Sequence, residues 1–285
     1  MNKWIDGMSA AEYLADPCDA PSLSSSIASL LVSKSPFHAW RAHPRLGNVR
    51  ESSDEQDRGT VIHALVLGEH HRFAVLDVTD YKTKAARERR DDATARGMIA
   101  VKRAFYDDCA LEAAGVCDKL RGRYGIELGD MAVERVAVWS EGGTICRARL
   151  DAWDGCTIYD LKTTRDASPA AIERTIRTYD YHVQQAAYTS AVEHVEPHLA
   201  GRVKFVFLFV ENDTGEVVPV ELGSGLAAIG VNRWRRAVDA WTRCMRTNKW
   251  PGYAPTEPLR VECSEWASTN DQVAALELRE RMAGI

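Results

Sequence analysis

The chain has 285 residues, 45% hydrophobic and 27% charged, with a formal net charge of −5. This composition is ordinary for a globular protein and excludes a disordered chain, a collagen-like repeat and a simple coiled coil. No run approaches the roughly 18 apolar residues of a membrane span, and acidic residues near the N-terminus argue against a secretory signal. The seven cysteines are scattered without a CxxC pair, so we expect neither a zinc ribbon nor a disulfide framework, and a cytoplasmic setting.

The first half of the chain is expected to be mainly helical. Short helices joined by loops are expected within residues 1–50, then a buried or half-buried helix over 58–70 and a polar helical region over about 82–122. Between Lys82 and Arg103 this region carries eight basic residues against three acidic ones. Such a pattern predicts either a solvated helix face or a local basic surface for nucleic acid, although the net negative charge disfavours indiscriminate coating.

The second half begins with three runs rich in β-branched residues, which predict strands over 131–139, 143–153 and 156–164. Asp154-Gly155 separates the last two and is a strong signal for a hairpin turn. The elements expected after them are a helical region over 168–195, a central strand over 202–211 and a helix over 224–247. We therefore expect one α/β domain over 1–285, with a helical N-terminal elaboration over 1–57 and a loose or helical tail over 268–285.

The hairpin predicts where its charged side chains lie. With Asp154 and Gly155 as the two loop residues, Asp160 lies opposite Arg149, and Lys162 lies opposite Arg147. Because side chains alternate along a strand, one face then shows Arg147, Arg149, Asp151, Asp160 and Lys162. The other face is predicted to be a core face of Ala148, Leu150, Ala152, Tyr159 and Leu161. A slip of one residue in register would reverse these faces.

Two carboxylates and a lysine thus converge on one edge of the hairpin. Crowded carboxylates raise each other's pKa unless a cation lies between them, and Mg²⁺ prefers such oxygen ligands. This arrangement outlines a site for metal-assisted phosphodiester hydrolysis, but a surface ladder of ion pairs with the arginines explains it equally well. A second Asp-x-Lys, at Asp80 and Lys82, follows no hairpin strand and is interpreted as a chance match.

Three residues elsewhere bear on this choice. His63 is a polar residue inside an apolar helix, and Gln184 and Tyr188 lie four residues apart on one helix face. Taken alone, the histidine is more typical of a satisfied core residue, and the other two are typical of an amphipathic helix.

The order His, Asp, Asp-x-Lys, Gln-x-x-x-Tyr resembles that of the PD-(D/E)xK nuclease superfamily in its RecB-like branch. More closely, the chain resembles the RecE-type (exonuclease VIII-like) exonucleases of phages and prophages. The resemblance covers roughly residues 20–267, and the segments that carry it are the serine-rich helix ending at Ser35-Pro36, GTVIHALVLGE, CRARLDAW, IYDLKTT, YHVQQAAY and WPGY. It implies a restriction-endonuclease-like α/β core with a central mixed sheet flanked by helices.

Carried over residue by residue, the resemblance implies that His63, Asp151, Asp160 and the Leu161 carbonyl bind the metal, and that Lys162 activates or positions the attacking water. Asp151, Asp160 and Lys162 are then the catalytic residues. The residues expected at the DNA are Gln184, Tyr188, Arg147 and Arg149. Weaker candidates are Glu134, for which pairing with Arg135 or Arg147 is an equal explanation, and Ser25, Ser26 and Ser35, for which helix capping is the favoured reading.

The resemblance also implies an activity: Mg²⁺-dependent, or Mn²⁺-dependent, 5′ to 3′ digestion of one strand of linear double-stranded DNA, which leaves 3′ overhangs for recombination by strand annealing. It implies a ring-shaped homo-oligomer, a single-strand annealing protein as partner, and a bacterial cytoplasm as location. No iron–sulfur cluster is expected, because Cys244 and Cys263 stand alone. The alternatives are a structure-specific or nicking endonuclease, a catalytically silent DNA-binding protein and, with less support, a hydrolase of small phosphate esters.

Overall fold

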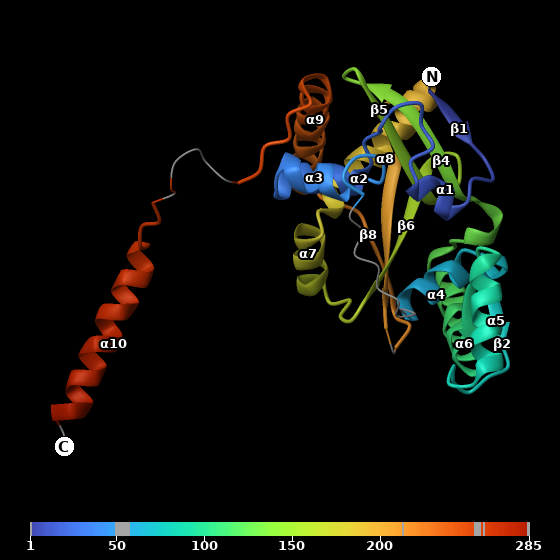
Figure 1. Cartoon of the computed structure of the whole chain (residues 1–285), viewed down its shortest axis with the longest axis horizontal. Coiled ribbons are helices and arrows are strands. Elements are labelled where there is room, and N and C mark those ends of the chain that lie inside the picture. Colours follow the sequence, from blue (N-terminus) through green and yellow to red (C-terminus); the bar gives the residue numbers. More distant parts are fainter. Residues whose placement is uncertain (1, 49–57, 213, 254–257, 259, 284–285) are drawn as a thin grey trace. The chain divides into compact units, whose positions relative to one another are not determined.

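The computed structural model describes residues 2–48, 58–212, 214–253, 258 and 260–283. The chain divides into two compact units, Met1–Trp250 and Pro251–Ile285. The second unit holds helix α10 (Glu265–Ala283), and the other elements described below belong to the first unit (Figure 1). Among the described residues, no helix is both long and apolar enough to cross a membrane.

Within the described part of the chain, a six-stranded mixed sheet runs through the first unit in the order β1-β4-β5-β6-β7-β8. Its strands are β1 (Lys3–Ile5), β4 (Ala132–Glu141), β5 (Thr144–Trp153), β6 (Thr157–Thr164), β7 (Lys204–Glu211) and β8 (Val217–Val220). Neighbours are antiparallel except β6 and β7, and this parallel pair is joined by a crossover through α7 (Pro169–Thr178) and α8 (Tyr181–Val195). The predicted α/β fold, a mixed sheet with the hairpin at its centre, is confirmed.

Helices cover both faces of this sheet. On one face α8 packs with α2 (Ser25–Ser33) and α9 (Ser224–Thr247), and α3 (Pro36–Ala42) lies beside them (Figure 1). These helices bury a first cluster that contains Trp139, Trp234 and Trp241. On the other face α4 (Arg58–Val66) and α6 (Arg103–Lys119) bury a second cluster around Leu161 and Leu208.

Strand β7 shows how the sequence produces this layered arrangement. Phe205, Phe207 and Phe209 belong to the first cluster, whereas Leu208 and Val210 between them belong to the second. Because side chains alternate along a strand, an apolar residue at each of these positions is what burial on both faces requires. The predicted central strand is confirmed.

The segment that follows α4 departs from the predicted elements. The helical region expected over 82–122 is broken into α5 (Lys84–Ala95), strand β3 (Ile99–Lys102) and α6, and β3 pairs in parallel with β2 (Phe73–Leu76). The prediction of one helical region was wrong because these four-residue strands exist only through their pairing with each other. The remaining short elements are α1 (Ala10–Leu14), 3₁₀ turns at His70–Arg72, Leu128–Asp130 and Pro197–Leu199, and a π turn at Leu120–Tyr124.

Candidate active site

The β5–β6 hairpin has a different register from the predicted one. Tyr159 pairs with Ala152 rather than with Leu150, because the loop is longer than two residues. The Asp154 carboxylate accepts hydrogen bonds from the backbone N–H groups of Cys156 and Thr157, at 2.8 and 2.6 Å, and closes a wider turn. The predicted register was therefore wrong by two residues, an even shift that leaves Asp160 on the same face of β6.

Beyond this turn the two strands separate, and the side chain of Asp151 fills the gap between them. The backbone N–H of Leu161 donates a hydrogen bond to Asp151 Oδ2 at 2.8 Å. In a continuous ladder, a backbone carbonyl of the neighbouring strand would accept this hydrogen bond. His63 Nε2, from α4, lies 3.0 Å from the same oxygen. The carboxylate of Asp151 thus joins β5, β6 and a helix on one face of the sheet.

The opposite strand is also distorted at this level. Glu134 has φ of +53°, and the β4–β5 pairing passes from Arg135↔Leu150 to Val133↔Ala152 around it. As a result, Leu150 contributes to the first cluster but Ala152 to the second. The prediction of one common core face was wrong: Ala148 and Leu150 face one cluster, and Ala152, Tyr159 and Leu161 face the other.

Asp160 approaches from β6, on the face covered by α8. It is fully buried, and its Oδ2 accepts a hydrogen bond of 2.7 Å from Gln184 Nε2. Its Oδ1 forms an ion pair with Lys162, whose ammonium lies 4.8 Å from the ring centre of Tyr181. The separation of β5 from β6 therefore brings together side chains from both faces of the sheet.

The pKa values of the two aspartates are shifted in opposite directions. Burial raises the pKa of Asp160 to about 6, although the Lys162 charge opposes this. Burial also disfavours ionised Asp151, yet the charge and hydrogen bond of His63 lower the pKa of Asp151 overall. Burial likewise opposes protonated Lys162, but Asp160 and Asp151 raise the pKa of its ammonium. Carboxyl groups with divergent pKa values in one site are typical of acid–base or metal chemistry.

Two further polar residues border the site. Burial raises the pKa of the Tyr188 hydroxyl well above its usual value, so that this group stays protonated. Glu134 forms an ion pair with Arg149 rather than with Arg135 or Arg147, and Arg149 lies 3.6 Å from Glu69 on its other side. Burial, and next the charge of Asp151, raise the pKa of Glu134 to about 7.

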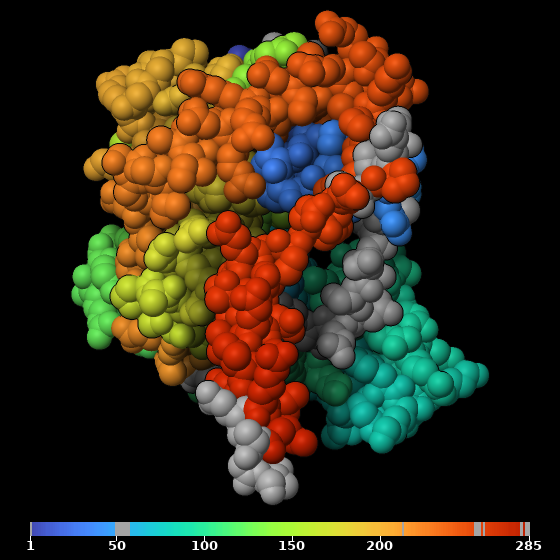
Figure 2. Space-filling model, turned by 90° about the vertical axis from the view of Figure 1, so that its left-hand side faces the viewer, coloured from blue at the N-terminus to red at the C-terminus, as the bar shows by residue number. Residues whose placement is uncertain are grey.

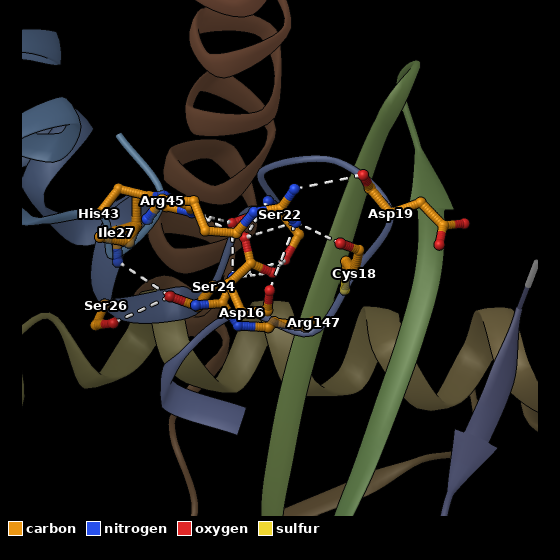
Figure 3. A network of polar contacts seen from close by, with 10 residues as sticks. All are labelled: Asp16, Cys18, Asp19, Ser22, Ser24, Ser26, Ile27, His43, Arg45 and Arg147. Carbon is orange, nitrogen blue, oxygen red and sulfur yellow. Dashed lines mark hydrogen bonds and ion pairs between the residues drawn. The ribbon is translucent and has the colours of Figure 1, made fainter. Parts of the chain in front are cut away.

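Arg147 contacts the N-terminal segment rather than Asp151, Asp160 or Lys162. It is 3% exposed, donates to the carbonyl and hydroxyl oxygens of Ser22 at 2.8 and 2.6 Å, and lies 3.2 Å from Asp16 (Figure 3). Burial would raise the pKa of Asp16, but hydrogen bonding to His43 and the Arg147 charge lower it to about 2. Arg147 thus ties the N-terminal segment to β5.

The three serines lie at helix starts. Ser25 is the first residue of α2, the Ser26 hydroxyl lies 3.1 Å from that of Ser24, and Ser24 caps the helix (Figure 3). Ser35 is at the N-cap position of α3, but its hydroxyl bonds His38 Nδ1 at 2.7 Å. The second Asp-x-Lys pair, Asp80 and Lys82, is an exposed ion pair of 3.8 Å.

Two residues that line the site were missed by the sequence analysis. Glu69 closes the segment GTVIHALVLGE, three residues beyond the end of α4, and Tyr181 lies three residues before Gln184 on α8. The aromatic residue three positions before Gln184 was a usable signal, because such residues share a helix face.

The side chains of the site are of the chemical type that binds a hard divalent cation. Carboxylate oxygens dominate the site, and the buried carboxylate of Asp160 has Lys162 at Oδ1 and Gln184 at Oδ2 as its partners. Within the described part of the chain, no three His, Cys, Asp or Glu side chains are already grouped to hold a metal. His63 and Asp151 instead contact each other, and Asp160 contacts Lys162 and Gln184. His63, Asp151 and Asp160 are the side chains that would hold a cation once these contacts open.

A mixed sheet whose central hairpin carries two aspartates and a lysine is the arrangement of a PDDEXK-like fold. The chain belongs to the family described as the PDDEXK-like domain of unknown function (DUF3799), whose sequence model matches residues 47–257. No curated protein matches the sequence.

A solved structure agrees with this fold. The structure of an exonuclease candidate from Eubacterium rectale superposes with a TM-score of 0.53 at 11% identity, over 90% of this chain and 96% of that one. The match to the structure of SSO0001 covers 63% of this chain and 85% of that chain at 15% identity, with a TM-score of only 0.26.

Proposed function

We propose that this chain is a divalent-metal-dependent deoxyribonuclease. It digests one strand of linear double-stranded DNA from 5′ to 3′ and leaves 3′ overhangs. The observation that carries the proposal is the convergence of His63, Asp151, Asp160 and Lys162 where β5 and β6 separate. Membership of a PDDEXK-like family supports hydrolysis of a phosphodiester, and the resemblance to RecE-type exonucleases supports the polarity.

His63, Asp151, Asp160 and the Leu161 carbonyl would hold Mg²⁺ or Mn²⁺. When bound, such a cation polarises the scissile phosphate and stabilises the leaving oxygen. The Leu161 N–H fixes the orientation of Asp151, and the Gln184 amide fixes that of Asp160. These hydrogen bonds hold the two carboxylates before substrate arrives, which is the preorganisation that catalysis requires.

Lys162 acts as the positioned cation of the site. Its ammonium stays protonated at neutral pH, because the two aspartates raise its pKa more than burial lowers it. The Tyr181 ring lies beneath it at 4.8 Å and limits its side-chain motion. The ammonium can therefore orient the attacking water or the phosphate, while Gln184 and Tyr188 contact the DNA nearby.

Arg149 is the arginine of the predicted pair that borders the reactive carboxylates. Its ion pairs with Glu134 and Glu69 keep it at the edge of the site, where it could exchange a carboxylate for a phosphate. The proposal also includes a ring-shaped homo-oligomer and a single-strand annealing protein that receives the product. A ring would let a chain of net charge −5 present basic surface inward only.

Duplex DNA labelled at either the 5′ or the 3′ end of one strand tests the polarity. With Mg²⁺, the proposal predicts early release of the 5′ label as short products and late loss of the 3′ label. Internal fragments from the first time point would favour the endonuclease. DNA binding without cleavage in Mg²⁺ or Mn²⁺ would favour the silent binding protein.

A further inference from the structure

An exposed tyrosine stands at the corner between α7 and α8, next to the proposed catalytic lysine. Tyr179 is 65% exposed, and its ring stacks on that of Tyr181 with a centroid distance of 5.8 Å and an interplanar angle of 24°. Tyr181 in turn stacks on Phe207 of the central sheet at 5.9 Å and 27°. Since the Lys162 ammonium lies over the Tyr181 ring, this stack leads from the reactive centre to the surface.

The corner that presents Tyr179 is held in place from two other helices. Asp180 has φ of +57°, in the left-handed region that non-glycine residues seldom adopt, and its side chain is buried. Its carboxylate accepts hydrogen bonds from Ser33 of α2 and, at 2.6 Å, from Arg233 of α9. Arg233 also donates to the Ser33 hydroxyl at 2.9 Å. This network holds the backbone of the corner, and the stack on Tyr181 orients the Tyr179 ring.

A basic groove continues from the same corner. It has a volume of about 820 Å³ and lies between α7, the start of α8 and α9, which meet on one face of the molecule (Figure 2). Arg174, Arg177 and Arg233 line it, together with Thr178 and His182, which flank the two tyrosines in the sequence. Its apolar lining residues are Ala170, Leu226 and Ile229. Glu173 also lines it and pairs with Arg177 at 3.6 Å. Both partners are exposed, so a phosphate can replace Glu173 at little cost.

We propose that the stacked Tyr179–Tyr181 pair and this groove bind a single-stranded segment of the DNA that is being digested. One unpaired base stacks on Tyr179, and the neighbouring phosphates contact Arg174 and Arg177. The inference rests on the proposed nuclease function and adds the path of the strand to it.

The geometry favours a single strand over a duplex. An exposed aromatic face can stack only on a base that is free of its neighbours, whereas bases within a duplex already stack on each other. A groove of positive charge beside an aromatic platform is the combination that single-strand binding proteins use. The arginines alone would serve a duplex equally well, and Tyr179 is what decides between the two.

Binding of a fluorescein-labelled oligothymidylate to the full chain, measured by anisotropy in EDTA so that no cleavage occurs, tests the inference. Tyr179→Ala is expected to weaken binding by about 5- to 150-fold, the range for loss of one base–aromatic stack. Tyr179→Phe keeps the ring and is expected to retain binding. The pair Arg174→Ala and Arg177→Ala is expected to weaken binding and to flatten its dependence on log salt by about 0.7 per arginine.

Arg243→Ala is the matched control, because Arg243 is an exposed arginine of α9 ten residues beyond Arg233 and outside the groove. Equal binding by wild type and Tyr179→Ala, or equal losses in Tyr179→Ala and Arg243→Ala, would overturn the inference. A loss of duplex binding as large as that of single-strand binding would also overturn it, in favour of general phosphate contact.

Cleavage of DNA by the wild type in Mg²⁺, run in parallel, separates this inference from the proposed function. Cleavage with unchanged single-strand binding in Tyr179→Ala rejects the strand path and leaves the nuclease intact. Tyr179-dependent binding without cleavage supports the strand path and contradicts the nuclease. Neither binding nor cleavage by the wild type rejects both.

Discussion

The carboxylate of Asp151 accepts the backbone N–H of Leu161 at 2.8 Å, at the place where the β5–β6 ladder stops. A side chain thus replaces a strand partner, and the gap that it spans is the space where Asp160, Lys162 and His63 meet. The same hydrogen bond therefore spans the opening in the sheet and sets the orientation of the Asp151 carboxylate.

Lys162→Ala is expected to slow DNA cleavage by roughly 100- to 1,000-fold, the usual effect of removing one positioned charge-stabilising group. Its affinity for Mn²⁺ is expected to stay equal or to tighten, because the Lys162 ammonium no longer repels the cation beside Asp160. Single-turnover cleavage and calorimetric titration with Mn²⁺ measure the two effects. Lys204→Ala, at an exposed lysine of the neighbouring strand β7, is the control. An equal loss of metal affinity in Lys162→Ala would mean that Lys162 serves the metal rather than the reaction.

Gln184→Leu is expected to lower the cleavage rate by about 10- to 100-fold, as is typical when a residue that orients a metal ligand is removed. The physical reason is the 2.7 Å hydrogen bond from Gln184 to Asp160, which leucine cannot make. Gln185→Leu changes the next residue of α8, which lines a separate groove beside Glu141 and Trp234, and is expected to keep the rate within about twofold. Equal rates for the two variants would show that Gln184 does not orient Asp160.

Much of the fold was predictable because its signals are local. The period of buried residues in α9, the alternation along β5 up to Leu150 and the apolar run of β7 follow from the sequence within each element. The Asp-Gly signal located the turn, but the hydrogen bonds of Asp154 to two N–H groups set its length, and that length shifted the register.

The remaining differences depend on contacts between distant residues. Arg147 forms an ion pair with Asp16 and donates a hydrogen bond to Ser22, and both partners lie more than 120 residues earlier in the chain. The change of face at Asp151 depends on the left-handed backbone of Glu134 across the ladder, which nothing near Asp151 in the sequence signals. The contacts of His63 with Asp151 and of Gln184 with Asp160 agree with the expected site, whereas the roles of these residues stay predictions.

Asp16→Asn tests the buried network of Figure 3 through its pH dependence. The pKa of Asp16 is about 2 in the folded chain against an ordinary value of 3.8, so its ionised form stabilises the fold above about pH 4. We expect the variant to lose about 2 kcal/mol of unfolding free energy at pH 7. This loss should shrink as the pH falls from 4 toward 2, because the wild-type carboxylate becomes protonated there. Urea unfolding at pH 7, 4 and 3 measures it, and a difference independent of pH would contradict the assigned role of Asp16.

Glu134→Gly is expected to be more stable than Glu134→Ala by about 1 kcal/mol, because only glycine adopts φ of +53° without strain. Both variants lose the ion pair with Arg149, so their difference isolates the backbone. At Glu88, an exposed residue inside α5, the order is expected to reverse, with glycine about 1 kcal/mol less stable than alanine. Urea unfolding of the four variants gives both differences. The same order at both sites would show that Glu134 does not need its left-handed conformation.

If Asp160 belongs to a metal-dependent exonuclease site, its removal must abolish the digestion of linear DNA. Incubation of the chain with Mg²⁺ and a mixture of linear and covalently closed circular duplex DNA tests it most directly, with Asp160→Ala as the control. The variant is expected to fold, as checked by circular dichroism, because burial already disfavours the charged carboxylate that it removes. We predict that wild type degrades the linear DNA and leaves the circles, and that Asp160→Ala leaves both. Cleavage by Asp160→Ala, or survival of the linear DNA with wild type in both Mg²⁺ and Mn²⁺, would contradict the account.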